Sequence, residues 1–312
     1  MDNLYLALTV IFPLFCMMSL GYFLQRINVL DKPFVKKLNL LCFNAFLPLV
    51  IFLNIYNSDF YSLFSPKLVI FGMASVTVAF IALMIIVPKF VEEDINRGVV
   101  IQGIFRSNFV LFGVPIAISL YGSENAGTAA ILTAFIVPLF NLYSVVALNL
   151  FSGTQFSKIE LVKKICKNPL IIGAMVAFLF VFTGFRMPSV LESTIADIAA
   201  IATPLALITL GGSFQFGDLK KFKELLTISV FGKLVIIPVI FLSIAILLGF
   251  RDVELASLMI MLASPTAVAS FTMAQSVNAN DELAGQIVVM TSLFSIFTIV
   301  CWISVLKNFG FM

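Results

Sequence analysis

The sequence contains no histidine and few charged residues. Only 11% of its 312 residues are Asp, Glu, Lys or Arg. The lack of histidine excludes Ser-His-Asp triads, zinc sites with histidine ligands and haem bound through histidine. We find no Gly-x-x-x-x-Gly-Lys-Ser/Thr phosphate loop and no Cys-x-x-Cys pair among the four cysteines. These absences argue against a protein driven by ATP hydrolysis, a thiol redox site and an enzyme in general.

Long apolar runs are what the sequence has instead. Hydrophobic residues make up 61% of the chain, against about 45–50% in soluble domains. A membrane-spanning helix needs about 20 apolar residues, and the runs here are too long and too continuous for barrel strands. We therefore predict an all-α polytopic membrane protein. Its ten expected transmembrane helices are residues 4–24, 38–56, 67–88, 98–121, 127–151, 169–185, 198–216, 225–249, 254–276 and 283–306.

The basic residues are concentrated in alternate loops. Thirteen of the 19 Lys and Arg residues lie in the first, third, fifth and seventh predicted loops. Cytoplasmic loops carry the excess of Lys and Arg, so we expect these loops in the cytoplasm and both termini outside. The net charge of +3 reflects this placement and does not indicate a nucleic-acid partner. Two cations, Arg106 and Lys233, lie inside apolar segments.

Prolines recur at half the chain length. Three pairs are 155 or 156 positions apart, namely Pro13 with Pro169, Pro33 with Pro188, and Pro48 with Pro204. This spacing predicts two repeats, residues 1–156 and 157–312, with five segments each. Because five is odd, the second repeat is inverted in the membrane relative to the first. Inverted repeats are typical of secondary transporters.

The fourth and ninth segments are interrupted at corresponding positions. Arg106-Ser107-Asn108 aligns with Ser264-Pro265-Thr266 at an offset of 158, and each triplet lies near the middle of its segment. Proline breaks or kinks a helix, so we expect broken, crossing helices here. Gly113 and Pro115 add a second weak point in the fourth segment, and Pro265 breaks the ninth. Corresponding interrupted segments indicate a transporter binding site.

Helix breaks near the membrane midplane favour an anion. Each break creates a helix N-terminus with free N–H groups and about half a positive charge, which suits a carboxylate. Arg106 would pair with it bidentately. The predicted substrate-binding residues are Arg106, Ser107, Asn108, Ser264, Pro265, Thr266 and Asn44.

Three points remain open on the sequence. Lys233 could pair with the substrate or serve as a structural counter-ion. Asn44 could line the substrate path or bond a carbonyl freed by Pro48. The carbonyls at opposing helix C-termini could suit a proton or Na⁺ as coupling ion. We predict no cofactor and no metal site.

The three motifs together resemble a known family. Residues 38–48, 106–115 and 263–275 are similar to the bacterial branch of the auxin efflux carrier family. The plant PIN auxin exporters form its eukaryotic branch, and the resemblance covers essentially the whole chain. Plant carriers have Pro-Asn at the break in the fourth segment, where this sequence has Ser107-Asn108. The break in the fourth segment is therefore expected to be softer here.

The resemblance implies a fold and an activity. The fold is that of the sodium–bile acid symporters, with segments 1, 2, 6 and 7 as a scaffold that often dimerises. Segments 3–5 and 8–10 form a transport domain with elevator-like motion. The implied substrates are small carboxylates such as malonate, malate or an auxin-like acid, carried across the bacterial inner membrane. The alternatives are a sodium-coupled organic anion symporter of the bile-acid type and a membrane receptor or sensor that does not transport.

Overall fold

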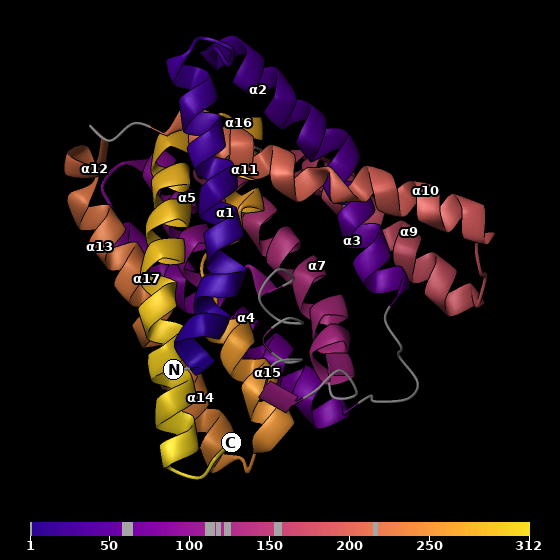
Figure 1. Cartoon of the computed structure of the whole chain (residues 1–312), viewed down its shortest axis with the longest axis vertical. Coiled ribbons are helices and arrows are strands. Elements are labelled where there is room, and N and C mark those ends of the chain that lie inside the picture. The colour runs from indigo at the N-terminus through magenta and orange to yellow at the C-terminus, as the bar shows by residue number, and fades with distance from the viewer. Residues whose placement is uncertain are drawn as a thin grey trace.

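The regular elements of the described chain are all helices. The computed structural model describes residues 2–57, 65–109, 116, 120–121, 126–152, 158–214 and 218–312. Within these ranges the elements, shown in Figure 1, are α1 (Asp2–Arg26), α2 (Lys32–Leu41), η1 (Cys42–Phe46), α3 (Leu47–Tyr56), α4 (Pro66–Ile86), η2 (Val87–Lys89), α5 (Asp94–Phe105), α7 (Ala126–Leu150), α8 (Lys158–Cys166), α9 (Pro169–Thr183), α10 (Ser189–Ala200), α11 (Ala202–Ser213), α12 (Asp218–Lys221), α13 (Lys223–Phe231), η4 (Gly232–Ile236), α14 (Ile237–Leu247), α15 (Asp252–Ala263), α16 (Ala269–Ser276) and α17 (Asp281–Asn308). The prediction of an all-α chain is confirmed.

Six helical stretches of the described residues are long and apolar enough to cross a membrane. They are Lys32–Tyr56, Pro66–Lys89, Ile131–Leu150, Ser189–Ser213, Lys223–Leu247 and Asp281–Asn308. Each overlaps one of the ten predicted segments, and α9 is a shorter apolar helix that overlaps a seventh. The protein is therefore a polytopic membrane protein, as its sequence predicts.

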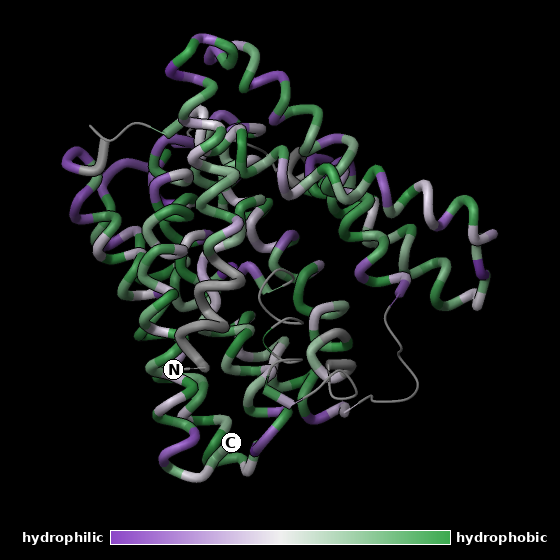
Figure 2. Tube along the Cα trace, viewed as in Figure 1, coloured by the Kyte–Doolittle hydropathy of each residue, from purple (hydrophilic) through white to green (hydrophobic). Residues whose placement is uncertain are grey.

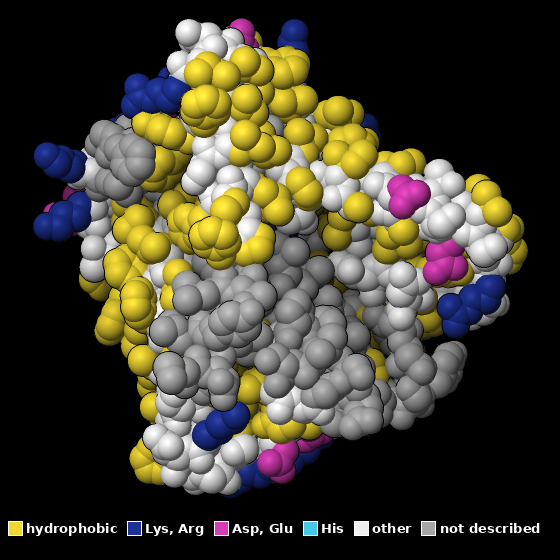
Figure 3. Space-filling view, in the orientation of Figure 1, with side chains coloured by type: hydrophobic (Ala, Val, Ile, Leu, Met, Phe, Trp, Pro, Cys, Tyr) yellow, Lys and Arg dark blue, Asp and Glu magenta, His cyan; other side chains and the backbone are white. Residues whose placement is uncertain are grey.

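The outer surface is apolar along the helices. Figure 2 shows hydrophobic residues along the lengths of most helices, with the hydrophilic ones gathered mainly near their ends. Figure 3 shows hydrophobic side chains over much of the described part of this face and basic side chains at its margins. Large apolar side chains such as Phe182 and Leu247 are 82% and 85% exposed. This distribution suits a hydrocarbon environment, in which apolar surface needs no cover.

The helices pack in two sets that meet near the centre. In the first, α1 lies along α11 and α3 along α9, and Figure 1 shows α3, α9 and α10 extending away from the rest. In the second, α5 and α4 pack on α7, α14 packs on α15, and α16 packs on α17. Contacts of α3 and α9 with α7, and of α11 with α16, join the two sets.

Glycines let α1 and α11 approach each other closely. A Cβ built on Gly21 would lie 2.0 Å from the carbonyl oxygen of Ile208, and one on Gly211 would lie 1.9 Å from that of Met18. Real atoms cannot approach so closely, so only glycine fits at either position. Small residues at helix contacts allow this kind of backbone packing in membranes. Gly21 and Gly211 thus make the close contact between α1 and α11 possible.

The close contact predicts unequal costs for two neighbouring substitutions. Gly211→Ala forces α1 and α11 apart and should lower the free energy of unfolding by about 1–3 kcal/mol. In Gly212→Ala the new Cβ would meet the Leu30 and Val35 side chains at 3.3 and 3.4 Å and the Gly21 carbonyl oxygen at an ordinary contact distance of 3.5 Å, so the change should be small. Thermal denaturation of both variants in detergent measures the difference. Equal melting temperatures would contradict the proposed role of Gly211.

Candidate functional site

Two helices of equal length end at corresponding positions. α5 runs from Asp94 to Phe105 and α15 from Asp252 to Ala263, each with 12 residues. Their starts are separated by the same offset of 158 that aligns the two polar triplets in the sequence. Beyond α15, residues 264–267 are not helical, and α16 begins at Ala269. The helix is therefore interrupted between Ala263 and Ala269, on both sides of Pro265.

The two helix ends meet and bond to each other. The backbone N–H of Asn108 donates to the carbonyl of Pro265 at 2.7 Å. The Thr266 hydroxyl donates to the Gly103 carbonyl at 2.6 Å, and the Thr266 N–H donates to the Thr291 hydroxyl at 3.1 Å. Non-helical backbone at membrane depth needs such protein partners because lipid supplies none. The structure thus brings the two predicted triplets together.

Arg106 is buried where the non-helical residues after α5 and α15 meet, a place that we call the crossing. Its side chain is 4% exposed, and its guanidinium donates to Asn141 Oδ1 at 2.7 Å and contacts the Met273 sulfur. Arg106 forms no ion pair within the described part of the chain. A buried charge without a counter-charge is destabilising by several kcal/mol, about 3–5 when a pair is broken. The site therefore holds a cation that an anion would stabilise.

A cavity with about 80 Å³ of space open to water molecules adjoins the crossing. Its lining includes Arg106, Ser107 and Asn108, and the residues that lead into α16, Ala267–Ala269. The rest of the lining comes mainly from α3, α7, α9 and α11 and is mostly apolar. No acidic residue is among the described residues that line the cavity. These are Leu47, Val50, Ile51, Asn54, Arg106, Ser107, Asn108, Phe109, Val137, Phe140, Asn141, Leu170, Thr203, Ala206, Ala267, Val268 and Ala269.

Two side-chain amide groups of this lining have hydrogen-bond donors that are not used. The side-chain nitrogens of Asn108 and Asn141 are buried and have no hydrogen-bond partner among the described residues. α16 also begins here, and helix N-termini present N–H groups and a partial positive charge. Unsatisfied buried donors are costly, so the cavity favours an acceptor-rich ligand. A carboxylate has that chemistry, because its two oxygens only accept.

Lys233 lies behind the crossing and does not line this cavity. It is fully buried in the π-helical turn η4, where its ammonium donates to the Ser107 hydroxyl and to the Leu262 carbonyl, the latter at 3.2 Å. It forms no ion pair within the described ranges. Of the two roles left open for Lys233, direct substrate pairing is not supported by this geometry.

The other predicted site residues have mixed placements. Ser264 is buried and its hydroxyl has no partner within the described ranges. Pro265 and Thr266 form hydrogen bonds at the crossing. None of the three residues lines the cavity. Asn44 is exposed and bonds the Leu40 carbonyl at 2.7 Å, so the structure does not bring it to the crossing. The predicted break residues Gly113 and Pro115 lie outside the described residues.

Sequence reasoning left Asn141 and the start of α16 out of the predicted site. Asn141 stands out as a polar residue in an apolar run, but nothing in its own segment shows that it faces Arg106. The contribution of Ala267–Ala269 comes from the position of a helix start, which their apolar side chains do not signal.

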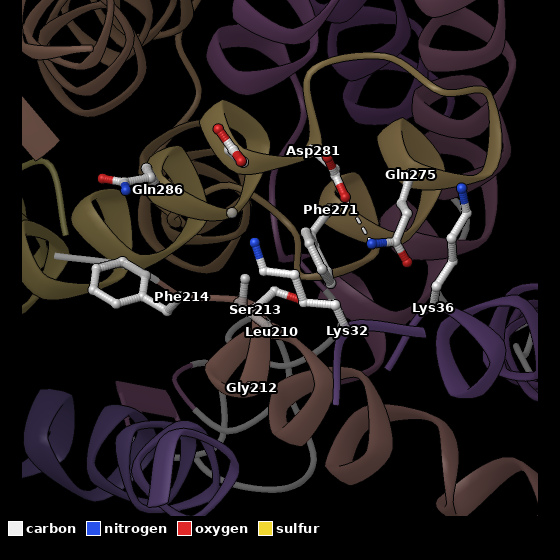
Figure 4. A pocket seen from close by; sticks show the side chains of 12 residues that line it. Lys32, Lys36, Leu210, Gly212, Ser213, Phe214, Phe271, Gln275, Asp281 and Gln286 are labelled. Carbon is white, nitrogen blue, oxygen red and sulfur yellow. Dashed lines mark hydrogen bonds between the residues drawn. The ribbon is translucent and has the colours of Figure 1, made fainter. Parts of the chain in front are cut away.

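A second, more polar cavity lies at the other end of α16. It has about 180 Å³ of open space and lies among α2, α11, α16 and α17. Figure 4 shows Lys32, Gln275 and Asp281 around it, with the Gln275 amide donating to Asp281 at 2.7 Å. Asn39 of α2 donates to Gln275 at 2.8 Å. Both charge signs are present, so this cavity does not select for an anion.

Broken helices that meet at a buried polar site in a helical membrane protein are the architecture of a membrane transporter. Comparison with known proteins agrees. Residues 6–303 match the family described as membrane transport protein, and the chain belongs to this family of auxin efflux carriers, which are transporters and not enzymes.

Two curated relatives are similar over nearly their whole lengths. A protein of Methanothermobacter thermautotrophicus named "Uncharacterized transporter" is 23% identical, with 92% of this chain and 94% of the relative covered. A Rhizobium meliloti protein named "Putative malonate transporter" is 24% identical, with 93% and 92% covered. The family predicted from the three sequence motifs is thus confirmed.

The crossing predicts a contrast between two buried threonines. Thr266→Val removes the bond to the Gly103 carbonyl and should lower stability by about 1–3 kcal/mol. Thr272 is equally buried, but its hydroxyl has no partner among the described residues. Thr272→Val should therefore be neutral or stabilising. Melting temperatures of the two variants give the comparison, and a Thr266→Val protein as stable as the wild type would argue against a crossing held by this bond.

Proposed function

We propose that the protein is a secondary transporter of a small organic anion whose carboxylate binds at the crossing. The observation that carries this proposal is Arg106, a buried cation without a counter-ion in the described chain, facing a cavity with unpaired amide donors. The substrate-binding residues proposed from the structure are Arg106, Ser107 and Asn108, with Asn141 and the start of α16. Ser264, Pro265 and Thr266 support them by holding the break.

The electrostatics of the cavity favour a carboxylate over a neutral or cationic solute. Arg106 presents several N–H groups in a planar fork that matches a carboxylate. The N-terminus of α16 adds a favourable potential for negative charge. A cationic solute would meet the like charge of Arg106 without a described acidic residue to offset it.

The apolar wall indicates the rest of the substrate. Leu47, Ile51 and Leu170 line the same cavity as Arg106, so they suit a short hydrocarbon body attached to the carboxylate. Mono- and dicarboxylates of the size of malonate or malate fit this description, and an auxin-like acid would need the cavity to widen. The name of the Rhizobium meliloti relative makes malonate the first candidate.

The proposed mechanism is of the elevator type. We propose ten membrane spans in two inverted repeats, residues 1–156 and 157–312. Scaffold helices 1, 2, 6 and 7 correspond to α1, α2–α3, α9 and α10–α11. Helices 3–5 and 8–10, which include α4, α5, α7 and α13–α17, form the transport domain. The equal lengths of α5 and α15 support the repeat. The cavity wall supports the division, because α3, α9 and α11 face elements of the other set across it.

The proposed location is the bacterial inner membrane, with both termini outside. The concentration of basic residues in alternate loops supports this orientation. The exposed apolar faces of the scaffold helices leave room for a homodimer.

Substitution of Arg106 tests the substrate site. Malonate should raise the melting temperature of the wild-type protein, because a ligand that binds the folded state stabilises it by mass action. Arg106→Met should weaken malonate binding by at least about thirtyfold, since losing one partner of a buried ion pair costs about 2–5 kcal/mol. Arg97→Met is the matched control on the same helix, because Arg97 pairs with Asp94 near the surface.

Flux in proteoliposomes completes the test. Saturable uptake of radiolabelled malonate, malate or indole acetate is expected with the wild type and with Arg97→Met, and not with Arg106→Met. Absence of saturable flux for all three acids would refute an organic anion transporter. Malonate affinity that is the same in Arg106→Met and the wild type would refute the location of the site.

A further inference from the structure

Lys233 is a buried cation with only neutral oxygen partners. Its side chain is fully buried, and the described partners of its ammonium are the Ser107 hydroxyl and the Leu262 carbonyl. A buried lysine normally pairs with a carboxylate, because removing its charge from water is costly. A neutral amide could bond the same two oxygens at a lower desolvation cost. The positive charge itself therefore calls for an explanation.

Local structure places Lys233 at the crossing. η4 interrupts the helix between α13 and α14 with π-type bonding, and such turns often mark functional sites. A Cβ on Gly232 would lie only 3.2 Å from the side chain of Ile104 in α5, so the turn packs closely on that helix. The Trp302 indole bonds the Leu234 carbonyl at 3.1 Å and supports the turn.

The partners of Lys233 are of the kind that bind inorganic cations. Leu262 is in the last turn of α15, where carbonyls lack intrahelical partners and the helix dipole is negative. Carbonyl and hydroxyl oxygens are the neutral ligands of hard metal cations. Here the ammonium, tethered to η4, takes the place that such an ion could occupy.

The hydrogen bond from Lys233 also determines where the O–H hydrogen of Ser107 can point. An ammonium only donates, so the Ser107 oxygen accepts from Lys233 and its own O–H hydrogen points elsewhere. Ser107 lines the cavity beside Arg106 and Asn108. Its hydroxyl is thereby set to donate to an anion in that cavity, and the neighbouring positive charge strengthens the bond.

We infer that Lys233 is a positioning residue and a built-in cation, which orients Ser107 toward the substrate carboxylate and makes an inorganic coupling cation such as Na⁺ unnecessary. The inference rests on the proposed function for the identity of the ligand. It goes beyond it by assigning a cation position behind the crossing and by choosing between the sodium-coupled and sodium-independent forms of transport.

Chemical rescue tests this assignment. Lys233→Ala removes three carbons and the ammonium, which together have the composition of propylammonium. Malonate binding by Lys233→Ala should be at least about tenfold weaker than that of the wild type, and propylammonium should restore it. Lys233→Met is the matched control, because it removes the charge but fills the space, so propylammonium should have no effect. Wild-type malonate affinity should be the same in sodium and choline chloride.

A double-mutant cycle separates positioning from structural support. Ser107→Ala and Lys233→Met should each weaken malonate binding, and the double variant should be little weaker than either alone, because both act on one hydrogen bond. Additive losses would overturn the positioning role. A wild-type affinity that requires Na⁺, or a Lys233→Met protein with wild-type affinity, would overturn the built-in cation.

Melting temperatures without malonate keep this inference distinct from the proposed function. Propylammonium should raise the melting temperature of Lys233→Ala and leave those of the wild type and Lys233→Met unchanged. If the wild type binds no malonate but this selective stabilisation is present, the proposed substrate is wrong and the cation position stands. If Lys233→Ala is not stabilised, the cation position is wrong, whatever the wild type binds.

Discussion

The hydrogen bond between the Asn108 N–H and the Pro265 carbonyl is the contact on which the candidate site depends. A membrane interior offers no water to backbone groups that leave a helix, so two helices can end there only if their free groups find protein partners. Where α5 and α15 end, the backbone groups that follow one helix bond to those that follow the other. The Thr266 hydroxyl also satisfies the Gly103 carbonyl, which lies in the last turn of α5.

Two buried cations of the crossing have separate roles. Arg106 lines the cavity, whereas Lys233 is behind Ser107 and reaches the end of α15. Their charges are not offset by acidic partners in the described chain. An anion in the cavity would therefore stabilise Arg106 directly, and it would interact with Lys233 through the Ser107 hydroxyl. This is the physical reason that charge selectivity can come from the crossing even though most of the cavity is apolar.

Much of this arrangement could be predicted from the sequence, because its signals are local. Apolar runs and basic loops define the spans, and Pro265 within an apolar run marks a break. The side of the crossing on which a residue lies is not a local property. Lys233 and Arg106 look alike in the sequence, yet the extra residue of the π-helical turn and the packing of Gly232 on Ile104 direct Lys233 away from the cavity. Asn44 likewise depends on which face of its helix meets the other set.

α16 links the crossing to the second cavity, and this has a mechanical consequence. Its start lines the cavity at the crossing, and Gln275 near its end bonds Asn39 of α2. In the proposed mechanism α2 belongs to the scaffold and α16 moves, so this bond must break during each cycle. Gln275 also bonds Asp281 of α17, and Lys36 of α2 bonds Asn278 at 3.4 Å. The two bonds from α2 join neutral amides or exposed side chains, so their exchange for water costs little. The bonds within the crossing are buried and join elements that move together, so the site can move without being taken apart.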